Sequence, residues 1–449
     1  MRDNSAANNY SAVKSYSTVN ARRSKKLNVR GVVVFLHRYM GLALALFLII
    51  AGVTGTAIAF YKELDQALNP ELYRIIERKQ PVLNADALVQ KIAQAYPQAF
   101  VNVMMLDRSV GESVRVRLSP LRDPISGKYF VLNYNEIFLD PFDGRILGGR
   151  AHGEFHFDRA HLMPFIYSVH YSLYMPDKWG DWLMGIVALI WMFDCFVGFY
   201  VTLPARAIRS GSSRKNWWQR WKPAWQIKRG ASGTRLNFDI HRATGLWLWL
   251  VLFMLAFTGV YFNLTREIFR PVLGWVAPLT PETTTILQQQ PQAFAPLKIS
   301  FEQAIAAAHK VRSPLSQRMV LSYIGLTPDA PGIYRVRFAD ANRGDANWKF
   351  HYENLFIDGA TGALVRRVGY DSGTAADKFI LWQYPLHSGQ VFGFWGRVFI
   401  GATGIAVAVL SITGIIIWWR KRRALRVRTV VLAKVLLKMS ADLKAQQFS

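Results

Sequence analysis

Four stretches of the chain stay apolar for longer than a soluble helix needs, and they constrain the fold more than any other feature. They cover roughly residues 31–60, 179–203, 243–263 and 395–419. About 18 consecutive apolar residues are enough to cross the hydrocarbon layer of a bilayer. Backbone groups cannot remain unpaired in lipid, so such segments fold as helices. We therefore predict a membrane α-helical protein with four transmembrane helices.

The distribution of charge predicts how these helices are oriented. The chain carries a net charge of +26, and most of it lies in three segments beside the apolar stretches. The segments 1–30, 204–236 and 420–449 hold 7, 9 and 9 Lys or Arg, with Asp3 and Asp442 as their only acids. Basic residues flanking membrane helices mark the cytoplasmic side and favour contact with anionic lipid. Both termini and the middle basic segment are therefore predicted to be cytoplasmic.

This topology divides the chain into alternating regions. The long connections 61–178 and 264–394 then lie on the side of the membrane opposite the cytoplasm, which we call the outside. Residues 204–242 form a basic, Trp-rich cytoplasmic loop with the start of the third helix. Interleaved Trp and basic residues also occur in proteins that bind single-stranded nucleic acid. Beside a membrane span, the same pattern favours lipid headgroups. We expect membrane lipid as a partner and no nucleic acid. The interleaved tryptophans are Trp217, Trp218, Trp221 and Trp225.

Several chemistries are excluded by what the sequence lacks. Cys195 is the only cysteine, which rules out an intrachain disulfide, an iron–sulfur cluster and a C-x-x-C zinc site. Without C-x-x-C-H, any haem would be bound non-covalently. The sequence contains no G-x-G-x-x-G after a strand and no P-loop, so it has no nucleotide-binding motif of its own.

The chain contains an internal repeat. Residues 36–42 (Leu-His-Arg-Tyr-Met-Gly-Leu) match residues 240–246 (Ile-His-Arg-Ala-Thr-Gly-Leu), and a Thr-Gly pair follows at 54–55 and at 258–259 without any gap. The second halves match as well, at Tyr-x-x-His and then at Trp-Gly. Each repeat therefore consists of a span, an outside region and a second span.

The outside regions also repeat, and we predict that each is a small α+β module with one helix against a short antiparallel sheet. Amphipathic periodicity indicates helices, and alternating apolar residues indicate strands. An Asp-to-Gly turn closes a strand in each module, at 136–144 and 354–362. The expected helices are 85–96 and 300–310, and the other strands are 101–106, 113–118, 318–324 and 333–338.

The repeat also sorts the nine histidines. His37 corresponds to His241, and both lie near the cytoplasmic ends of spans one and three. His170 corresponds to His387, and both precede the main apolar runs of spans two and four, near the outer face. Polar residues inside a membrane are costly and usually functional. We predict that His37 and His241 (the first pair) bind one haem and that His170 and His387 (the second pair) bind another.

Small residues accompany these histidines along the helices. Gly41 and Gly55 follow His37 on the same helical face, with Gly52 close to that face, and Gly245 and Gly259 repeat the pattern after His241. Such a stripe allows close helix packing, and a flat porphyrin needs the same absence of side chains beside its axial histidine. Both interpretations stay open at this stage.

Two arginines and a possible zinc site offer further alternatives. Arg38 and Arg242 follow the first-pair histidines and could pair with haem propionates or act as ordinary cytoplasmic anchors. Two histidines at each depth, with no cysteine and no facing carboxylates, make poor zinc geometry. Haem is therefore the preferred cofactor.

At these residues the sequence resembles the PepSY-associated transmembrane family. The resemblance covers about residues 30–420 and is weaker in the outside regions, where the second module has Asp358-Gly359 without the proline of the first. The matching pieces are His37-Arg38-x-x-Gly41-Leu42, Leu386-His387 with Trp395-Gly396, the Asp140-Pro-x-x-Gly144 turn, and 182–200. The family includes haem-containing reductases of ferric siderophores in the inner membrane of Gram-negative bacteria. The resemblance implies two b-type haems, two periplasmic PepSY-like modules and electron transfer to a ferric siderophore.

The residues themselves support an electron path more than a particular acceptor. Without a nucleotide motif, electrons must come from a quinol or from a cytoplasmic reductase. Two alternatives remain: a membrane-anchored protease inhibitor or assembly factor without redox activity, and a cytochrome that reduces a periplasmic acceptor other than iron.

Four more residues have no assigned role. His152, His156 and His161 have no counterparts in the second repeat, and could bind a metal or ferric complex or simply face solvent. Asp194 lies deep in the second span, where the other repeat has Leu410. An acid in this position indicates either proton handling or a buried hydrogen bond.

Overall fold

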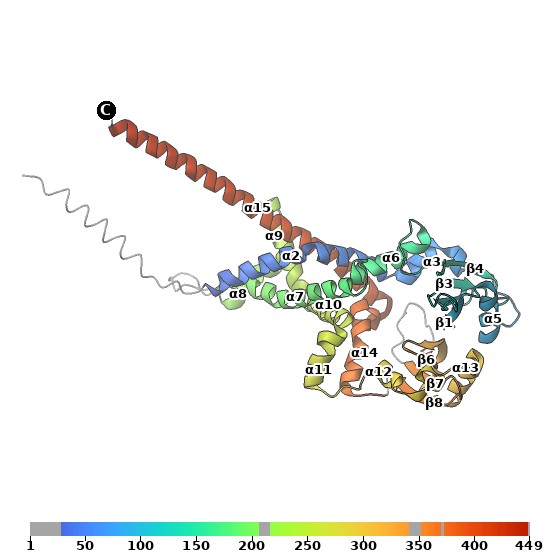
Figure 1. Cartoon of the computed structure of the whole chain (residues 1–449). Coiled ribbons are helices and arrows are strands. Elements are labelled where there is room, and N and C mark those ends of the chain that lie inside the picture. Colours follow the sequence, from blue (N-terminus) through green and yellow to red (C-terminus); the bar gives the residue numbers. More distant parts are fainter. Residues whose placement is uncertain (1–27, 206–215, 341–351, 370–371, 448–449) are drawn as a thin grey trace, which may run out of the picture.

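The computed structural model describes residues 28–205, 216–340, 352–369 and 372–447. A bundle of helices carries a β-sheet domain at one end, which we call the sheet end, and the C-terminal helix projects from the opposite, tail end (Figure 1). The basic segment 1–27 lies outside the described residues.

Three helical segments of the bundle are long and apolar enough to cross a membrane. A fourth span exists if α9 and α10, which are bent by 68° relative to each other, are counted as one. The chain is therefore a multi-pass membrane protein with three spans, or four with the bent pair. The helices are α2 (Val29–Ile58), α7 (Trp179–Thr202), α9 (Gly233–Trp247), α10 (Trp249–Asn263) and α15 (Gly393–Gln447).

The third predicted span, 243–263, is not one straight helix. Leu248 interrupts it with φ −99° and ψ 1°, outside the helical region, although no proline is present. The tryptophans on either side of the break donate indole hydrogen bonds to carbonyls of different elements. Trp247 Nε1 donates to the carbonyl of Trp225 at 3.1 Å, and Trp249 Nε1 donates to the carbonyl of Cys195 at 2.9 Å. Periodicity did not reveal this bend, because Leu248 lies inside a continuous run of apolar residues from Leu246 to Phe257.

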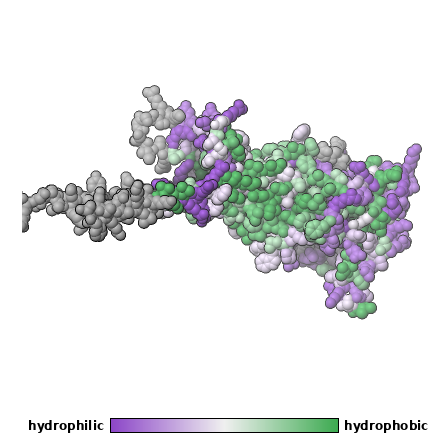
Figure 2. Space-filling view, turned by 90° about the horizontal axis from the view of Figure 1, so that it is seen from above, coloured by the Kyte–Doolittle hydropathy of each residue, from purple (hydrophilic) through white to green (hydrophobic). Residues whose placement is uncertain are grey.

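The surface of the helix bundle is apolar, as expected for helices that cross a membrane. Figure 2 shows apolar side chains over the helices, between hydrophilic surfaces at the two ends. Val53, Phe193, Leu250 and Ile405 are among the large apolar residues exposed there. At the tail end, α15 continues without a break through the basic C-terminal segment to Gln447.

The sheet domain contains eight antiparallel strands in the order β4-β3-β2-β1-β5-β6-β7-β8. Residues 99–150 supply one half and residues 320–369 supply the other, and each half packs one amphipathic helix into a shared core. The strands are β1 (Ala99–Met105), β2 (Val114–Pro120), β3 (Glu136–Leu139), β4 (Ile146–Arg150), β5 (Val320–Thr327), β6 (Ala330–Ala339), β7 (Tyr352–Asp358) and β8 (Leu364–Gly369). The two core helices are α5 (Ala85–Ala95) and α13 (Phe301–Lys310).

The two predicted modules share one continuous sheet, and the sequence did not indicate this pairing. β1 and β5 pair at the seam, with Met104 opposite Ile324 and Val103 opposite Gly325. A side chain at Gly325 would collide with the carbonyl of Asn102, so this close approach requires glycine. Cross-repeat pairing could not be read from either repeat alone.

Each edge of the sheet leads into a helix that carries a histidine of the second pair. β4 is followed by α6 (Arg159–Ser172), and β8 is followed by α14 (Ala375–Ser388). These helices end before the spans begin, at Leu173 (φ 54°) and Gly389 (φ 76°). His170 and His387 therefore lie on separate helices and not on the spans. The remaining helices are α3 (Tyr61–Leu68), α4 (Pro70–Tyr73), α8 (Trp217–Trp221), α11 (Arg270–Val276) and α12 (Thr283–Gln288), with short η segments at 222–225, 265–269, 291–294, 316–318 and 390–392.

Candidate functional site: two histidine pairs

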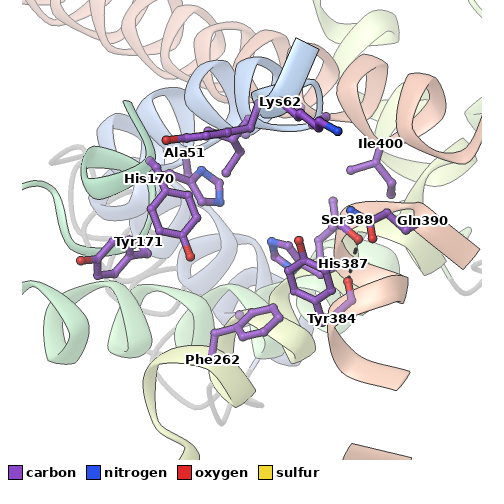
Figure 3. Close-up of a pocket in the computed structure, with 18 of the residues that line it drawn as sticks. Ala51, Lys62, His170, Tyr171, Phe262, Tyr384, His387, Ser388, Gln390 and Ile400 are labelled. Carbon is purple, nitrogen blue, oxygen red and sulfur yellow. Dashed lines mark hydrogen bonds between the residues drawn. The ribbon is translucent and has the colours of Figure 1, made fainter. Parts of the chain in front are cut away.

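The four repeat-matched histidines come together as the two predicted pairs. The imidazole rings of His37 (α2) and His241 (α9) have centroids 6.2 Å apart, with their planes at 54°. The rings of His170 (α6) and His387 (α14) also lie 6.2 Å apart, at 70°. Figure 3 shows His170 and His387 projecting into one space from opposite sides. Each pair combines one histidine from each repeat.

Hydrogen bonds fix the tautomer of the second pair. His170 Nδ1 lies 3.1 Å from the hydroxyl of Thr54, and His387 Nδ1 lies 2.6 Å from the hydroxyl of Thr258. Each threonine already donates its hydrogen to a backbone carbonyl one turn earlier, at 2.6 and 2.8 Å. Each hydroxyl must therefore accept from the imidazole, which places the hydrogen on Nδ1. The lone pair is left on Nε2.

The first pair reaches the same tautomer with different partners. His37 Nδ1 lies 3.0 Å from a carboxylate oxygen of Asp194 on α7. His241 Nδ1 lies 3.0 Å from the carbonyl of Leu410 and 3.1 Å from the hydroxyl of Thr413, both on α15. Carboxylates and carbonyls can only accept, so Nδ1 carries the hydrogen in both rings. Across the part of the chain that is described, no hydrogen bond engages Nε2 of any of these four histidines.

This arrangement has the spacing and the donors that a bis-histidine metal site requires. Two metal–nitrogen bonds of about 2 Å, with roughly 1 Å from each nitrogen to its ring centre, give a centroid separation of about 6 Å. Metal-binding histidines characteristically donate Nδ1–H to a carboxylate, carbonyl or hydroxyl, which orients the ring. Both features occur at both pairs. The residues present therefore fit one haem iron at each pair.

The glycine stripe divides into three kinds of position. A side chain at Gly55 would lie 3.0 Å from His170 Cε1, so this glycine makes room for the ring. Gly52 instead packs against the backbone of Gly404 where α2 crosses α15. No atom lies within 4 Å of a Cβ placed at Gly41, and only a Leu410 methyl at 3.9 Å approaches one placed at Gly245. Space is thus open beside both first-pair histidines.

Two further glycines face the first pair from the other helices. A Cβ at Gly198 would lie 3.0 Å from His37 Cε1, and one at Gly414 would lie 3.2 Å from His241 Cε1. Both occupy the same position in the repeat, but the site predicted from the sequence omitted them. Gly259 lines the cavity beside the second pair, as Gly55 does, and a Cβ there would lie 3.1 Å from the methyl of Ala188. That contact is helix packing.

The two arginines after the first-pair histidines differ in their contacts. Arg242 forms an ion pair with Asp239 at 2.9 Å and donates to the carbonyl of Pro223 at 2.6 Å. These contacts agree with the anchoring alternative. Arg38 forms no hydrogen bond or ion pair with the residues that the structure describes.

The second pair opens into a cavity of about 840 Å³ that reaches the sheet domain. This volume lies within the range of roughly 300–1,000 Å³ that is typical of small-molecule sites. Its walls toward the tail end are apolar residues of the spans, and its walls toward the sheet end carry tyrosines, four cations and the carboxylates of Asp107 and Glu112. Strands contribute only from the first half of the sheet. The cations lining it are Lys62, Arg108, Arg115 and Arg117, and the tyrosines are Tyr61, Tyr73, Tyr167, Tyr171 and Tyr384.

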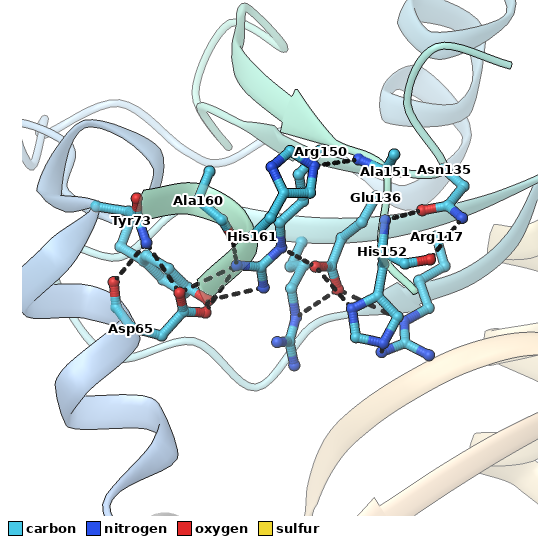
Figure 4. Close-up of polar contacts among 12 residues, drawn as sticks. Asp65, Tyr73, Arg117, Asn135, Glu136, Arg150, Ala151, His152, Ala160 and His161 are labelled. Carbon is cyan, nitrogen blue, oxygen red and sulfur yellow. Dashed lines mark hydrogen bonds and ion pairs between the residues drawn. The ribbon is translucent and has the colours of Figure 1, made fainter. Parts of the chain in front are cut away.

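A buried ionic network above this cavity holds α6 against the first half of the sheet (Figure 4). Arg150 is fully buried and binds Asp65 at 2.9 Å and Glu136 at 2.6 Å. It also donates to the carbonyl of Ala160 in α6 at 2.9 Å. Buried charges need such complete pairing. Through α6, the network positions His170.

The charges in and beside this network shift the pKa values of Glu136 and His152. Burial alone would raise the pKa of Glu136, but Arg115 and Arg150 outweigh it and hold that pKa at about 2. Burial lowers the pKa of His152 to about 4, and the nearby arginines act in the same direction against the attraction of Glu136. His152 is therefore neutral at pH 7.

The histidines that lack repeat counterparts do not form a metal site. His161 is buried, with Nδ1 bound to Asp158 at 2.7 Å and Nε2 accepting from the backbone of Ala151 at 3.0 Å. His152 lines the cavity, and His156 is exposed beside Glu154. Within the four described ranges, no group of three or more His, Cys, Asp or Glu could hold a metal ion.

Sequence reasoning missed the partners of the histidines. Thr54 and Thr258 stood out as part of the repeat, but their bonds to the rings of the second pair were not foreseen. Asp194 had two open interpretations, and the structure gives it a hydrogen bond to His37. The signal in each case is a polar residue at a fixed repeat position inside an apolar span.

The fold and the paired histidines define a multi-pass membrane protein whose helix bundle carries an α+β domain. The chain belongs to the family described as the PepSY-associated TM region, whose model matches residues 34–421. This match confirms the family resemblance seen in the sequence. No curated protein matches the chain.

Proposed function

We propose that this protein is a di-haem electron-transfer protein of the bacterial inner membrane that reduces a periplasmic acceptor, namely a ferric siderophore. The observation that carries the proposal is the occurrence, twice, of two histidines 6.2 Å apart with Nδ1 already bonded. In this proposal, both termini are cytoplasmic and the sheet domain is periplasmic, as the basic flanks of the spans favour.

The residues present would hold two haems of the b type. His37 and His241 would ligate one iron, and His170 and His387 would ligate the other. Haem bound to two histidines supplies one-electron transfer and leaves no open iron position for a substrate. The chain's own contribution is to hold and orient the four rings through their Nδ1 hydrogen bonds.

The position of the two pairs along α2 supports transfer across the membrane. His37 belongs to the first pair, and Thr54, which holds His170, lies 17 residues later on the same helix. At 1.5 Å per residue, this is about 26 Å, close to the thickness of the hydrocarbon layer. Because the chain has no nucleotide-binding motif, the electron donor is a quinol or a cytoplasmic reductase.

The cavity beside the second pair supports an oxygen-rich, anionic acceptor. Its walls at the sheet end carry four cations against two carboxylates, and their guanidinium groups and tyrosine hydroxyls can donate hydrogen bonds to hydroxamate, catecholate or carboxylate oxygens. One electron converts bound Fe(III) to Fe(II), which hard oxygen ligands hold less tightly, so iron is released. A quinol that loses two electrons and two protons would reduce two such complexes.

A haem count on the purified full chain tests the cofactor part of the proposal. We expect two haems per chain and a reduced-minus-oxidised spectrum typical of bis-histidine ligation. His37→Ala and His241→Ala should each remove the same haem, and His170→Ala and His387→Ala should each remove the other. The matched control is His309→Ala, at an exposed position on α13. A haem-free protein with all four histidines intact would contradict the proposal.

A single-turnover experiment tests the acceptor separately. Protein reduced with dithionite is mixed with a ferric siderophore while a ferrous chelator captures the product. We expect reoxidation of the haems at the same rate as formation of the ferrous chelate, and loss of both signals in His387→Ala. Haems that stay reduced would exclude this acceptor and would leave electron transfer to another periplasmic acceptor as the function.

A further inference from the structure

The Nδ1 partners of the four histidines differ in charge. His170 and His387 bond to threonine hydroxyls, and His241 bonds to a carbonyl and a hydroxyl. His37 alone bonds to a carboxylate, that of Asp194, whose two oxygens lie 3.0 and 3.1 Å from Nδ1. Three of the four histidines therefore have neutral acceptors, and one has an anion.

The internal repeat makes this difference specific to the first half of the chain. Asp194 and Leu410 occupy the same position, four residues before Gly198 and Gly414, which face the rings of the first pair. At one repeat the histidine receives a side-chain carboxylate, and at the other it receives the backbone carbonyl of the matching residue. Both repeats thus place a hydrogen-bond acceptor at Nδ1 of the first-pair histidine, but only the acceptor in the first repeat is charged.

The carboxylate of Asp194 is directed at His37 only. Asp194 is 7% exposed and lies within α7, where the surroundings are apolar. Among the residues that the structure describes, no Lys or Arg forms an ion pair with it. A low local dielectric strengthens its interaction with the imidazole, so the charge is neither neutralised by a cation nor screened by water.

We infer that Asp194 lowers the reduction potential at the first pair and thereby makes electron flow from the first pair to the second pair downhill. A carboxylate that accepts the Nδ1 hydrogen makes the imidazole a stronger donor through Nε2. Stronger donation and nearby negative charge favour the oxidised iron over the reduced iron. The second pair has only neutral acceptors and keeps a higher potential. This inference rests on the proposed function and adds its direction.

Asp194→Asn isolates the charge, because the amide oxygen can still accept from Nδ1 at the same place. Changes to such partners typically alter metal affinity or activity 10- to 100-fold. We expect the reduced-to-oxidised ratio at the first pair to rise by a similar factor at fixed potential. At 59 mV per tenfold for one electron, the shift is about 60–120 mV upward. The second pair should not change.

The measurement is a spectroelectrochemical titration of the full-length protein, read in the spectrum of each haem. Asp194→Glu keeps the charge and should keep the order of the two potentials. Thr413→Val is the matched control, because it removes a neutral partner from His241 in the same site and leaves its carbonyl partner. Its effect should be smaller than that of Asp194→Asn.

The outcomes separate this inference from the proposed function. Two haems with unchanged potentials in Asp194→Asn would overturn the role of Asp194 and leave the function intact. Absence of haem from the unmodified protein would overturn both. If Asp194→Asn does not load the first pair, Asp194→Ser, which offers a neutral hydroxyl acceptor, provides the same comparison, and an unraised potential there would also overturn the inference.

Discussion

Substitution of Gly41 by leucine separates helix packing from cofactor binding in the glycine stripe. No atom lies within 4 Å of a Cβ placed at Gly41. In the protein without cofactor, the new side chain would meet open space, and leucine inserts into a membrane at least as well as glycine. We therefore expect normal insertion and no loss of unfolding free energy, because leucine has a higher helix propensity than glycine by roughly 0.5–1 kcal/mol.

The same leucine should strongly reduce haem binding at the first pair. Gly41 lies one helical turn after His37, so its side chain would occupy space beside the ring that a porphyrin needs. Overpacking of a filled site costs about 1–3 kcal/mol, which corresponds to roughly a 5- to 150-fold loss of affinity. The assay is haem retention during dialysis against a haem-binding competitor, followed in the spectrum of each haem.

Gly52→Leu provides the matched control, since Gly52 already packs against the backbone of Gly404. It should separate α2 from α15 and destabilise the whole bundle, with both haems lost together. The reasoning about Gly41 would be refuted if Gly41→Leu retained haem at the first pair as well as the unmodified protein does. It would also be refuted if the variant lost both haems together with its fold, as Gly52→Leu is expected to.

Three other changes test the surrounding structure. Arg150→Met leaves two buried carboxylates without their partner and should destabilise the sheet domain by about 3–5 kcal/mol, measured by chemical denaturation. Thr258→Val removes the 2.6 Å hydrogen bond of a second-pair histidine and should weaken haem binding there about 10- to 100-fold, with the other haem unaffected. Stability should also fall with acidification. The pKa of His152 is about 4 in the folded protein, so below about pH 6.5 the unfolded chain binds a proton there that the folded protein does not. The pKa of Glu136 is about 2 in the folded protein, so below about pH 4.5 the same holds for its carboxyl group. Each group accounts for at most about 3 kcal/mol, and a flat unfolding midpoint from pH 7 to 4 would contradict this assignment.

The sequence allowed the histidine pairs to be predicted because the repeat supplied an internal comparison. His37 and His241 each precede a glycine by four residues, and His170 and His387 each lie shortly before a Trp-Gly pair and an apolar run. Position relative to the apolar runs indicated the depth of each histidine. Membrane character and family membership rest on the same long-range patterns, and the match over residues 34–421 agrees with them. Helix and strand positions in the sheet domain also followed from local periodicity.

Features that depend on contacts between repeats could not be predicted in this way. The β1–β5 seam pairs strands more than 200 residues apart, and nothing within either strand specifies its neighbour. The partners of the rings are equally non-local, because Asp194 and Thr54 reach histidines on other helices. The indole hydrogen bonds on either side of the bend at Leu248 also reach carbonyls that are distant in the sequence. None of these contacts leaves a periodic signal in the sequence.

The continuity of the sheet has a consequence for the order of biogenesis. The helices with His170 and His387 each follow an edge strand, β4 or β8, and the edges are fixed relative to each other only when β1 pairs with β5. The second pair therefore cannot assemble until residues 320–388 have been synthesised and β5 has paired with β1. A chain stalled after the third apolar stretch already contains both histidines of the first pair, but only His170 of the second. Completion of the second pair therefore depends on synthesis of both halves of the sheet, whereas the histidines of the first pair are present earlier.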